Sequence, residues 1–220
     1  MKKKIALFMS CMLLCAAIFT CDSMSVQSAA KPKITSKGRK AIKAYQEFLG
    51  QSTIQWSNLS YASEKFCFIL IDLNKDGVPE LFLKNMGSPS HYEGYQAVYS
   101  YNKNKIQKIC YDDEITSFFP KSGIMETNYF GMGGRTSYVK ILKNGKMKEI
   151  AYIKYSHPTV PQEKTTYYWC NGKKEIDVTK SKFNRLLKKT AGKKSVKLKE
   201  SDWHNNTASN RKNMRKLLKK

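Results

Sequence analysis

Apolar and polar positions follow two different periods along this chain, and the change of period separates helical from β-rich parts. From residue 36 to 49 the apolar residues recur at helical spacing, and Gly50 is a natural stop. From 66 to 178 the pattern is that of strands, rich in Tyr, Phe, Trp, Val and Ile. The 179–220 segment returns to helical spacing, with short apolar stripes and many Lys and Arg residues. It predicts two basic helices, the second running from Thr207 through Leu218.

Short turns between the β-rich runs indicate that the strands pair as antiparallel hairpins. Asn144-Gly145 and Asn171-Gly172 suit the type I′ turn, which needs a positive φ at both central residues. A looser version of this turn lies at 102–104, between the runs YQAVYSY and KIQKICY. The predicted fold class is α+β, in which one N-terminal and two C-terminal helices pack on an antiparallel hairpin sheet. A propeller-like arrangement of the hairpins is an alternative.

The first 30 residues have the three parts of a secretory signal peptide. Lys residues at 2–4 precede an apolar run at 5–20, and the small residues at 28–30 offer a cleavage site. The apolar run is about 16 residues long, short of the roughly 20 that span a bilayer. We therefore expect residues 31–220 to form one secreted domain with no transmembrane segment.

The cysteines leave two questions open. Cys21 offers an alternative to cleavage after residue 30, in which the chain is a surface lipoprotein acylated at this residue. Three cysteines follow the leader: Cys67, Cys110 and Cys170. They are too few for a disulfide framework, and each lies in a strand-like context. Buried free thiols are therefore expected, with a single disulfide as the alternative.

The chain carries a formal net charge of +23, which limits its partners. In a cytosolic protein such a charge would suggest nucleic acid, but the signal peptide argues against that partner. Anionic cell-wall polymers and host glycans are the polyanions that a secreted protein meets, and basic charge favours adsorption to them. A Lys-rich surface that is simply solvated is the alternative.

An acidic loop at 72–80, DLNKDGVPE, has the ligand spacing of a calcium site. Calcium prefers six to eight oxygen ligands, and side chains at positions 1, 3 and 5 of a tight loop converge on one point. The predicted ligands are Asp72, Asn74, Asp76, the backbone carbonyl of Val78, and Glu80. Position 12 is Leu83 and strands flank the loop, so the sequence is not an EF-hand. A hairpin loop of turn-forming residues is the alternative.

The loop resembles the calcium loops of integrin-type β-propeller repeats, in which D-x-N-x-D-G-x-x-[DE] joins two strands. The resemblance covers about a dozen residues and occurs once, whereas a propeller needs several copies. It implies the ion chemistry and not the propeller fold. The expected cofactor is a structural calcium ion.

Motifs for catalysis are missing from the sequence. It contains no GxSxG, no HExxH and no cysteine-centred nucleophile motif. We therefore predict a secreted, calcium-stabilised binding module and not an enzyme. A secreted hydrolase acting on glycan or peptide is the alternative, because a pair of catalytic carboxylates cannot be recognised from sequence.

Most of the mature chain also resembles a group of uncharacterised small secreted proteins of gut Clostridia. The matching pieces are AYQEFL, FILIDLNKDGVPELFL, VYSYNKNKIQKI, FFPKSGIMETNYFGMGG, YVKILKNGKMKEI and NTASNRKNMRKLL. The resemblance implies an extracellular Gram-positive setting and a shared architecture. It implies no activity.

Overall fold

The computed structural model describes residues 33–56, 58–87, 96–112, 114–120, 122–129, 134–142, 146–155, 165–171 and 174–219. They belong to one compact unit, Lys31–Lys220. The predicted signal peptide, with Cys21, lies outside the described residues, as do the Asn144-Gly145 turn and Gly172. None of the helices in the described part of the chain has the length and apolar character needed to cross a bilayer.

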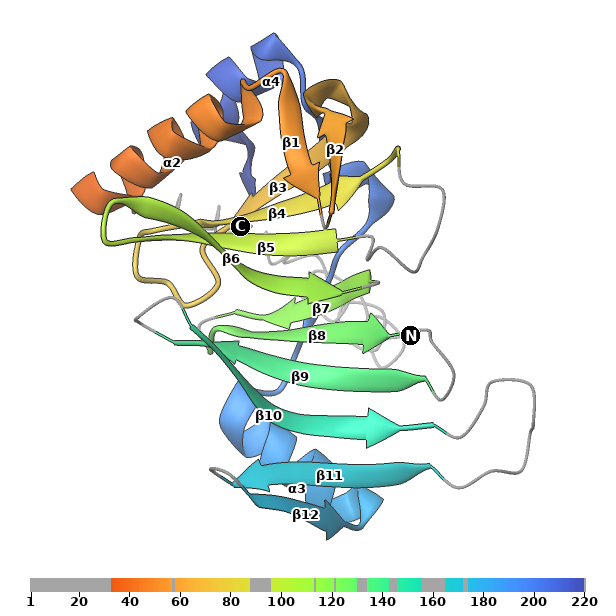
Figure 1. The fold of residues 1–220 in the computed structure, drawn as a ribbon. Helices are drawn as coiled ribbons and strands as arrows, with labels where there is room; N and C mark the ends of the chain where they lie inside the picture. The colour runs from red at the N-terminus through yellow and green to blue at the C-terminus, as the bar shows by residue number, and fades with distance from the viewer. Residues whose placement is uncertain are drawn as a thin grey trace, which may run out of the picture. The chain divides into compact units, whose positions relative to one another are not determined.

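Three α-helices and a long series of strands make up the described chain (Figure 1). The helices are α2 (Ser36–Leu49), α3 (Lys180–Ala191) and α4 (Ala208–Lys212). The first strands are β1 (Thr53–Trp56), β2 (Leu59–Ala62), β3 (Phe66–Ile71), β4 (Glu80–Asn85), β5 (Gln96–Asn102) and β6 (Lys105–Asp112). The next are β7 (Glu114–Phe119), β8 (Ile124–Tyr129), β9 (Arg135–Ile141), β10 (Met147–Lys154), β11 (Thr166–Asn171) and β12 (Lys174–Val178). Three two-residue strands follow: β13 (Val196–Lys197), β14 (His204–Asn205) and β15 (Leu218–Lys219).

The strands form three open sheets, and the pairing is antiparallel except where β15 runs parallel to β3. The small sheet is the β1-β2 hairpin. The six-stranded sheet has the order β14-β3-β4-β5-β6, with β15 also paired to β3, and the seven-stranded sheet has the order β12-β11-β10-β9-β8-β7-β13. The predicted α+β class with antiparallel hairpins is confirmed. Besides the β1-β2 hairpin, the described strands form two long open sheets, and the propeller-like alternative is not confirmed.

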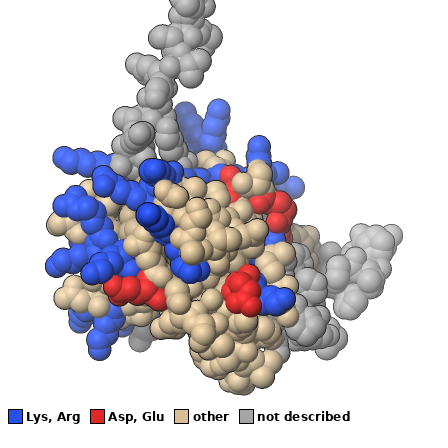
Figure 2. All heavy atoms as spheres, turned by 90° about the horizontal axis from the view of Figure 1, so that it is seen from above, with Lys and Arg blue, Asp and Glu red and all other residues tan. Residues whose placement is uncertain are grey.

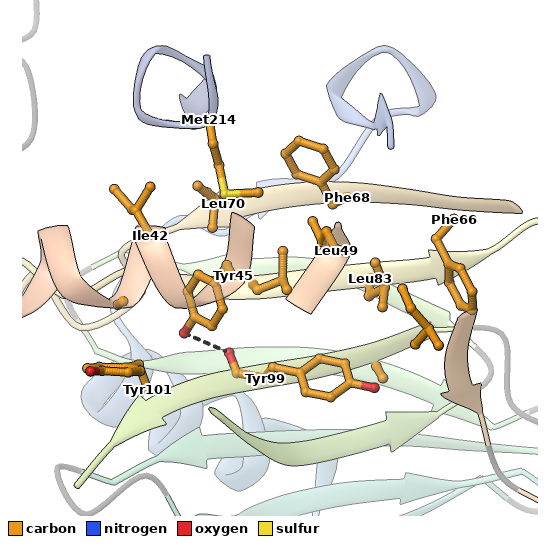
Figure 3. Packing of buried hydrophobic residues seen from close by; sticks show 14 of the residues in the cluster. Ile42, Tyr45, Leu49, Phe66, Phe68, Leu70, Leu83, Tyr99, Tyr101 and Met214 are labelled. Carbon is orange, nitrogen blue, oxygen red and sulfur yellow. Dashed lines mark hydrogen bonds between the residues drawn. The ribbon is translucent and has the colours of Figure 1, made fainter. Parts of the chain in front are cut away.

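Helix α2 covers one face of the six-stranded sheet (Figure 3). It begins at its N-cap Thr35, whose hydroxyl accepts a hydrogen bond from the amide of Gly38 at 3.0 Å. Tyr45 points from the helix into the cluster, and its hydroxyl lies within hydrogen-bond distance of the carbonyls of Pro79 at 3.1 Å and of Tyr99 on β5 at 3.4 Å. The buried side chains on this face include Ile42, Tyr45, Leu49, Phe66, Phe68, Leu70, Leu83, Tyr99 and Met214. The helical stripe read from the sequence is therefore the face that packs on the sheet.

The opposite face of the six-stranded sheet is also buried, which explains the uninterrupted apolar runs of its strands. Alternate residues of β3, β4 and β5 enter a second core cluster with residues of β7, β8 and β9. Ile69 and Phe82 from one sheet and Met125 and Val139 from the other are members of this cluster. The two large sheets are thus joined through apolar side chains, and β3 and β4 are buried at every position.

Helix α3 packs on the seven-stranded sheet at the other end of the unit (Figure 1). Phe183 is buried among Tyr138, Tyr167 and Trp169, with ring centroids 5.3 to 6.4 Å away. On strands β10 and β11, the side chains that alternate with this apolar set lie on the opposite face. That face holds the polar cluster described below.

Several predicted elements differ from the structure. The last predicted helix, from Thr207 through Leu218, is only the five-residue α4, followed by a 3-10 turn at Met214–Leu217. It ends early because Leu218 pairs as a strand with Leu70 of β3, while Met214 enters the core. The hairpin β1-β2 lies before the predicted β-rich region and was not predicted, and strand β7 lies within that region but was not predicted as a separate strand. The turn after β5 is confirmed, with φ of 49° at Lys103 and 60° at Asn104.

Candidate metal centre

The acidic loop joins β3 to β4 and is wound tightly by two residues with positive φ. Lys75 has φ of 59° and Gly77 has φ of 80°. The second of these values favours glycine, which has no Cβ to clash in this region. The winding brings the side chains of Asp72, Asn74 and Asp76 back over the amides of the same loop.

Most of the loop oxygens accept hydrogen bonds from backbone amides. Asp72 accepts from the amides of Asp76 at 3.1 Å and Gly77 at 3.0 Å. Asp76 accepts from the amide of Val78 at 2.8 Å, and the Asn74 carbonyl oxygen accepts from the amide of Asp76 at 3.1 Å. A carboxylate offers about four lone-pair sites on its two oxygens, so one or two amide bonds leave sites that can face a cation.

Glu80 is the buried carboxylate of the loop, with 5% of its surface exposed. Its Oε2 accepts from the amide of Leu73 at 3.1 Å. Burial raises the pKa of Glu80 from 4.5 to about 8; the Leu73 amide opposes this rise, and the charges of Asp76 and Asp72 add to it. Burial also raises the pKa of Asp72, against the amide of Gly77. The described residues supply no ion pair to either carboxylate.

A cavity of about 20 Å³ lies between this loop and β5. Four of the predicted ligand residues line it: Asn74, Asp76, Val78 and Glu80. Ser100 of β5 also lines it, and its hydroxyl is buried and has no hydrogen-bond partner among the described residues. The volume suits one water molecule or one ion.

The loop is docked on the N-terminus of α2 through backbone contacts. The carbonyl of Gly77 accepts hydrogen bonds from the amide of Thr35 at 3.1 Å and from its hydroxyl at 3.0 Å. A side chain at Gly38 would overlap this same carbonyl, and one at Gly77 would lie 2.6 Å from the Thr35 methyl. The conformation of the loop is therefore coupled to the position of α2.

The structure brings Asn74, Asp76, Val78 and Glu80 to the cavity. Asp72 instead accepts hydrogen bonds from loop amides, and it is not among the described residues that line the cavity. The carboxylates of Asp72, Asp76 and Glu80 are not gathered within 4.8 Å of one another. Among the described residues, the set of three ligating side chains that meets this distance is Glu149, Cys170 and Glu175.

We call the second set the four-strand cluster: Arg135 of β9, Glu149 and Tyr152 of β10, Cys170 of β11, and Glu175 of β12. A guanidinium nitrogen of Arg135 donates to Glu149, and the guanidinium lies 3.7 Å from the ring centroid of Tyr152. Tyr152 donates its hydroxyl to Glu175 at 2.6 Å and stacks on Tyr168 with ring centroids 4.6 Å apart. The cluster thus contains its own cation.

The sequence analysis missed Ser100 and the four-strand cluster. Their members are far apart along the chain, and only the pairing of the strands brings them together. The alternation of side chains along β5 and along β10 to β12 shows which residues share a face of a strand. It shows which residues of different strands meet only when the register between the strands is known.

Cys67, Cys110 and Cys170 form no disulfide within the described part of the chain, and Cys67 and Cys110 are buried. Comparison of the chain with protein-family models, with curated proteins and with solved structures finds no match.

Proposed function

We propose that this chain is a secreted binding module whose fold is stabilised by one calcium ion in the 72–80 loop. The ion would be held by oxygens of Asn74, Asp76, Val78 and Glu80. Asp72 would hold the loop in shape by accepting hydrogen bonds from backbone amides of the loop. The role of the ion is structural. It would fix the β3-β4 connection and, through Gly77, the N-terminus of α2.

The observation that supports this proposal is the environment of Glu80. A buried carboxylate normally has a cationic partner or loses its charge, because desolvation of an isolated charge costs several kcal/mol. Glu80 has two neighbouring carboxylates, Asp72 and Asp76, and no ion pair among the described residues. A divalent cation in the adjoining cavity would supply the missing positive charge.

A thermal melt in calcium and then in EGTA tests the proposal. Extracellular calcium modules bind with a Kd on the order of 10⁻⁴–10⁻³ M, so calcium is used at several millimolar. Binding at about ten times Kd should raise the Tm of a domain of this size by about 3–6 °C. Asp76→Ala should lose this rise, and Asp177→Ala, an exposed aspartate on β12, should keep it. Equal melting of the wild type in both buffers would falsify the proposal.

The partner we propose is an anionic cell-wall polymer or host glycan. The net charge of +23 supports this, and Figure 2 shows Lys and Arg gathered toward the left side and the upper edge of the face seen from the α2 and α4 end. Helix α3 carries five basic residues and no acidic one. Binding to an anionic polymer should weaken steeply with salt, because exposed charges are screened. Retention on teichoic-acid-bearing cell walls, compared with walls stripped of it, is the measurement, and equal retention would exclude this partner.

One observation favours a second candidate function, a secreted hydrolase. Glu149 and Glu175 lie within 4.8 Å of each other beside Tyr152 and Tyr168, and paired carboxylates beside aromatic rings are the usual machinery of glycoside hydrolysis. Wild type and Glu175→Gln would be assayed on cell-wall glycans and on peptides. Release of product by the wild type alone would support the hydrolase, and no release by either protein would exclude it for those substrates.

Secretion and the resemblance to small secreted proteins of gut Clostridia are part of the same proposal. Mass spectrometry of the mature N-terminus separates the two routes to the cell exterior. A chain that begins at Lys31 indicates signal-peptide cleavage, and a chain that begins at an acylated Cys21 indicates a surface lipoprotein.

A further inference from the structure

We infer that the ion site extends beyond the loop, and that Ser100 of β5 supplies an oxygen ligand to it while Lys37 of α2 limits its affinity. The inference rests on the proposed calcium function and deepens it. The predicted loop ligands come from nine consecutive residues, whereas Ser100 and Lys37 belong to two other elements that line the same cavity.

The pairing of β4 with β5 places Ser100 beside Glu80. Leu81 pairs with Tyr99 and Phe82 pairs with Val98, so the next position in this register sets Glu80 opposite Ser100. Side chains directly opposite each other project to the same face, with Cβ atoms about 4.5–5.5 Å apart. Both side chains therefore lie on the face of Phe82 and Val98, at the end of the sheet where the loop closes.

The hydroxyl of Ser100 is buried, and only 5% of the residue is exposed. Its oxygen makes no hydrogen bond to any described residue, although the carboxylate of Glu80 is its neighbour across the strands. A buried hydroxyl without a partner costs about 1–3 kcal/mol. A cation between Ser100 and Glu80 would remove this cost, since the hydroxyl oxygen would become a ligand together with the carboxylate.

A second buried hydroxyl without a partner in the described chain provides a control for Ser100. Thr127 of β8 is fully buried and its hydroxyl has no partner, but it does not line the cavity. The difference between Ser100 and Thr127 is therefore the acidic cavity itself.

Lys37 also lines the cavity, from an exposed position in the first turn of α2. Its ammonium group would repel a divalent cation that approaches Asp76 and Glu80. Each interaction between exposed charges contributes little free energy, so the effect of Lys37 on calcium affinity should be small and should vanish at high salt. Lys43, on the same helix, is paired with Glu47 at 3.9 Å and lies outside the cavity. It is the matched control for the charge.

Thermal melts of the full chain over a series of calcium concentrations test the inference by giving an apparent Kd for each variant. Ser100→Ala should bind calcium about tenfold more weakly than wild type. In EGTA it should be as stable as wild type or more stable, because it loses only an unpartnered hydroxyl. Thr127→Val should keep the wild-type Kd. Lys37→Met should bind calcium about two- to fivefold more tightly, and Lys43→Met should not.

The outcomes separate the inference from the proposed function. If wild type responds to calcium and Ser100→Ala has the same apparent Kd, the loop binds the ion alone and the inference is overturned. A drop in stability of Ser100→Ala in EGTA, with its apparent Kd unchanged, would also overturn it, because the hydroxyl would then have a structural role. If wild type itself does not respond, the calcium function fails, and the inference fails with it.

Discussion

The 72–80 loop and the four-strand cluster both gather carboxylates, but they differ in the cation that faces them. In the four-strand cluster Arg135 pairs with Glu149 and covers the ring of Tyr152, whose hydroxyl bonds Glu175. In the loop the acidic side chains are held by backbone amides, and Glu80 is buried beside two further carboxylates. One cluster contains an ion pair formed by its own side chains, whereas the loop carboxylates make no ion pair with the described residues.

From this difference we expect the tighter cluster to be the weaker metal site. Glu149, Cys170 and Glu175 have ligand atoms within 4.8 Å, which is a favourable spacing for a metal ion. A metal at that position would share Glu149 with the guanidinium of Arg135, whose positive charge repels it, and would share Glu175 with the hydroxyl of Tyr152. A metal entering the loop cavity would displace no cationic side chain from an ion pair in the described structure.

The largest effect we predict is a pH dependence of the free energy of unfolding, which should come from the loop and not from the four-strand cluster. The folded-state pKa of Glu80 is raised from 4.5 to about 8, so between these values the folded chain holds a proton that the unfolded chain has released. Stability from this group is fully present below about pH 4.5 and is lost as pH rises to about 8, by up to about 1.4 kcal/mol for each pH unit. Urea unfolding in EGTA across this range measures it.

Calcium and a substitution provide the controls for this pH dependence. Calcium favours the ionised form of Glu80, so saturating calcium should reduce the fall in stability. Glu80→Gln should remove it, because the amide does not titrate. A wild-type profile that matches Glu80→Gln in EGTA would show that Glu80 ionises normally, and the contrast between the two clusters would be lost.

The second prediction concerns how the loop is held in place. Gly38→Ala puts a methyl group against the carbonyl of Gly77, so α2 must move away and both hydrogen bonds from Thr35 to that carbonyl weaken. We expect a loss of about 2–3 kcal/mol in the free energy of unfolding. Gly134→Ala, near the four-strand cluster, is the control, since its new methyl group would have no neighbour closer than 3.6 Å. Equal stability of the two variants would contradict the coupling of loop and helix.

The same contrast explains what the sequence could predict. The loop ligands are contiguous, so their spacing is visible before any pairing is known. The helix at 36–49 was also predicted with its observed bounds, because its apolar stripe and Gly50 are local signals. Ser100 and the four-strand cluster depend on register between strands, which local patterns do not contain. The chain after Thr207 was predicted as one helix because its apolar spacing does not reveal that Leu218 pairs with β3.

The third prediction removes the ion pair of the four-strand cluster. Arg135→Ala leaves Glu149 without its partner and uncovers the ring of Tyr152, which should cost about 1–2 kcal/mol. The remaining Glu149, Cys170 and Glu175 then form an acidic set without an internal cation. We expect this variant, unlike wild type, to melt at a higher temperature in micromolar zinc. A wild type already stabilised by zinc would show that Arg135 does not exclude a metal.

The smallest effect we predict is at Cys170, and it tests whether the thiol takes part in metal binding at all. Burial raises the pKa of Cys170, and the charges of Glu149 and Glu175 add to the rise against that of Arg135. The thiol should therefore stay protonated at neutral pH, and a protonated thiol is a poor nucleophile and a poor ligand. Cys170→Ser should change stability by less than about 0.5 kcal/mol.

Alkylation with iodoacetamide, followed at this residue by peptide mass spectrometry, should be slow in wild type and faster in Glu175→Gln. Zinc should not protect the wild-type thiol, because the thiol stays protonated and Arg135 is paired with Glu149 beside it. Stoichiometric protection would instead identify the four-strand cluster as a metal site.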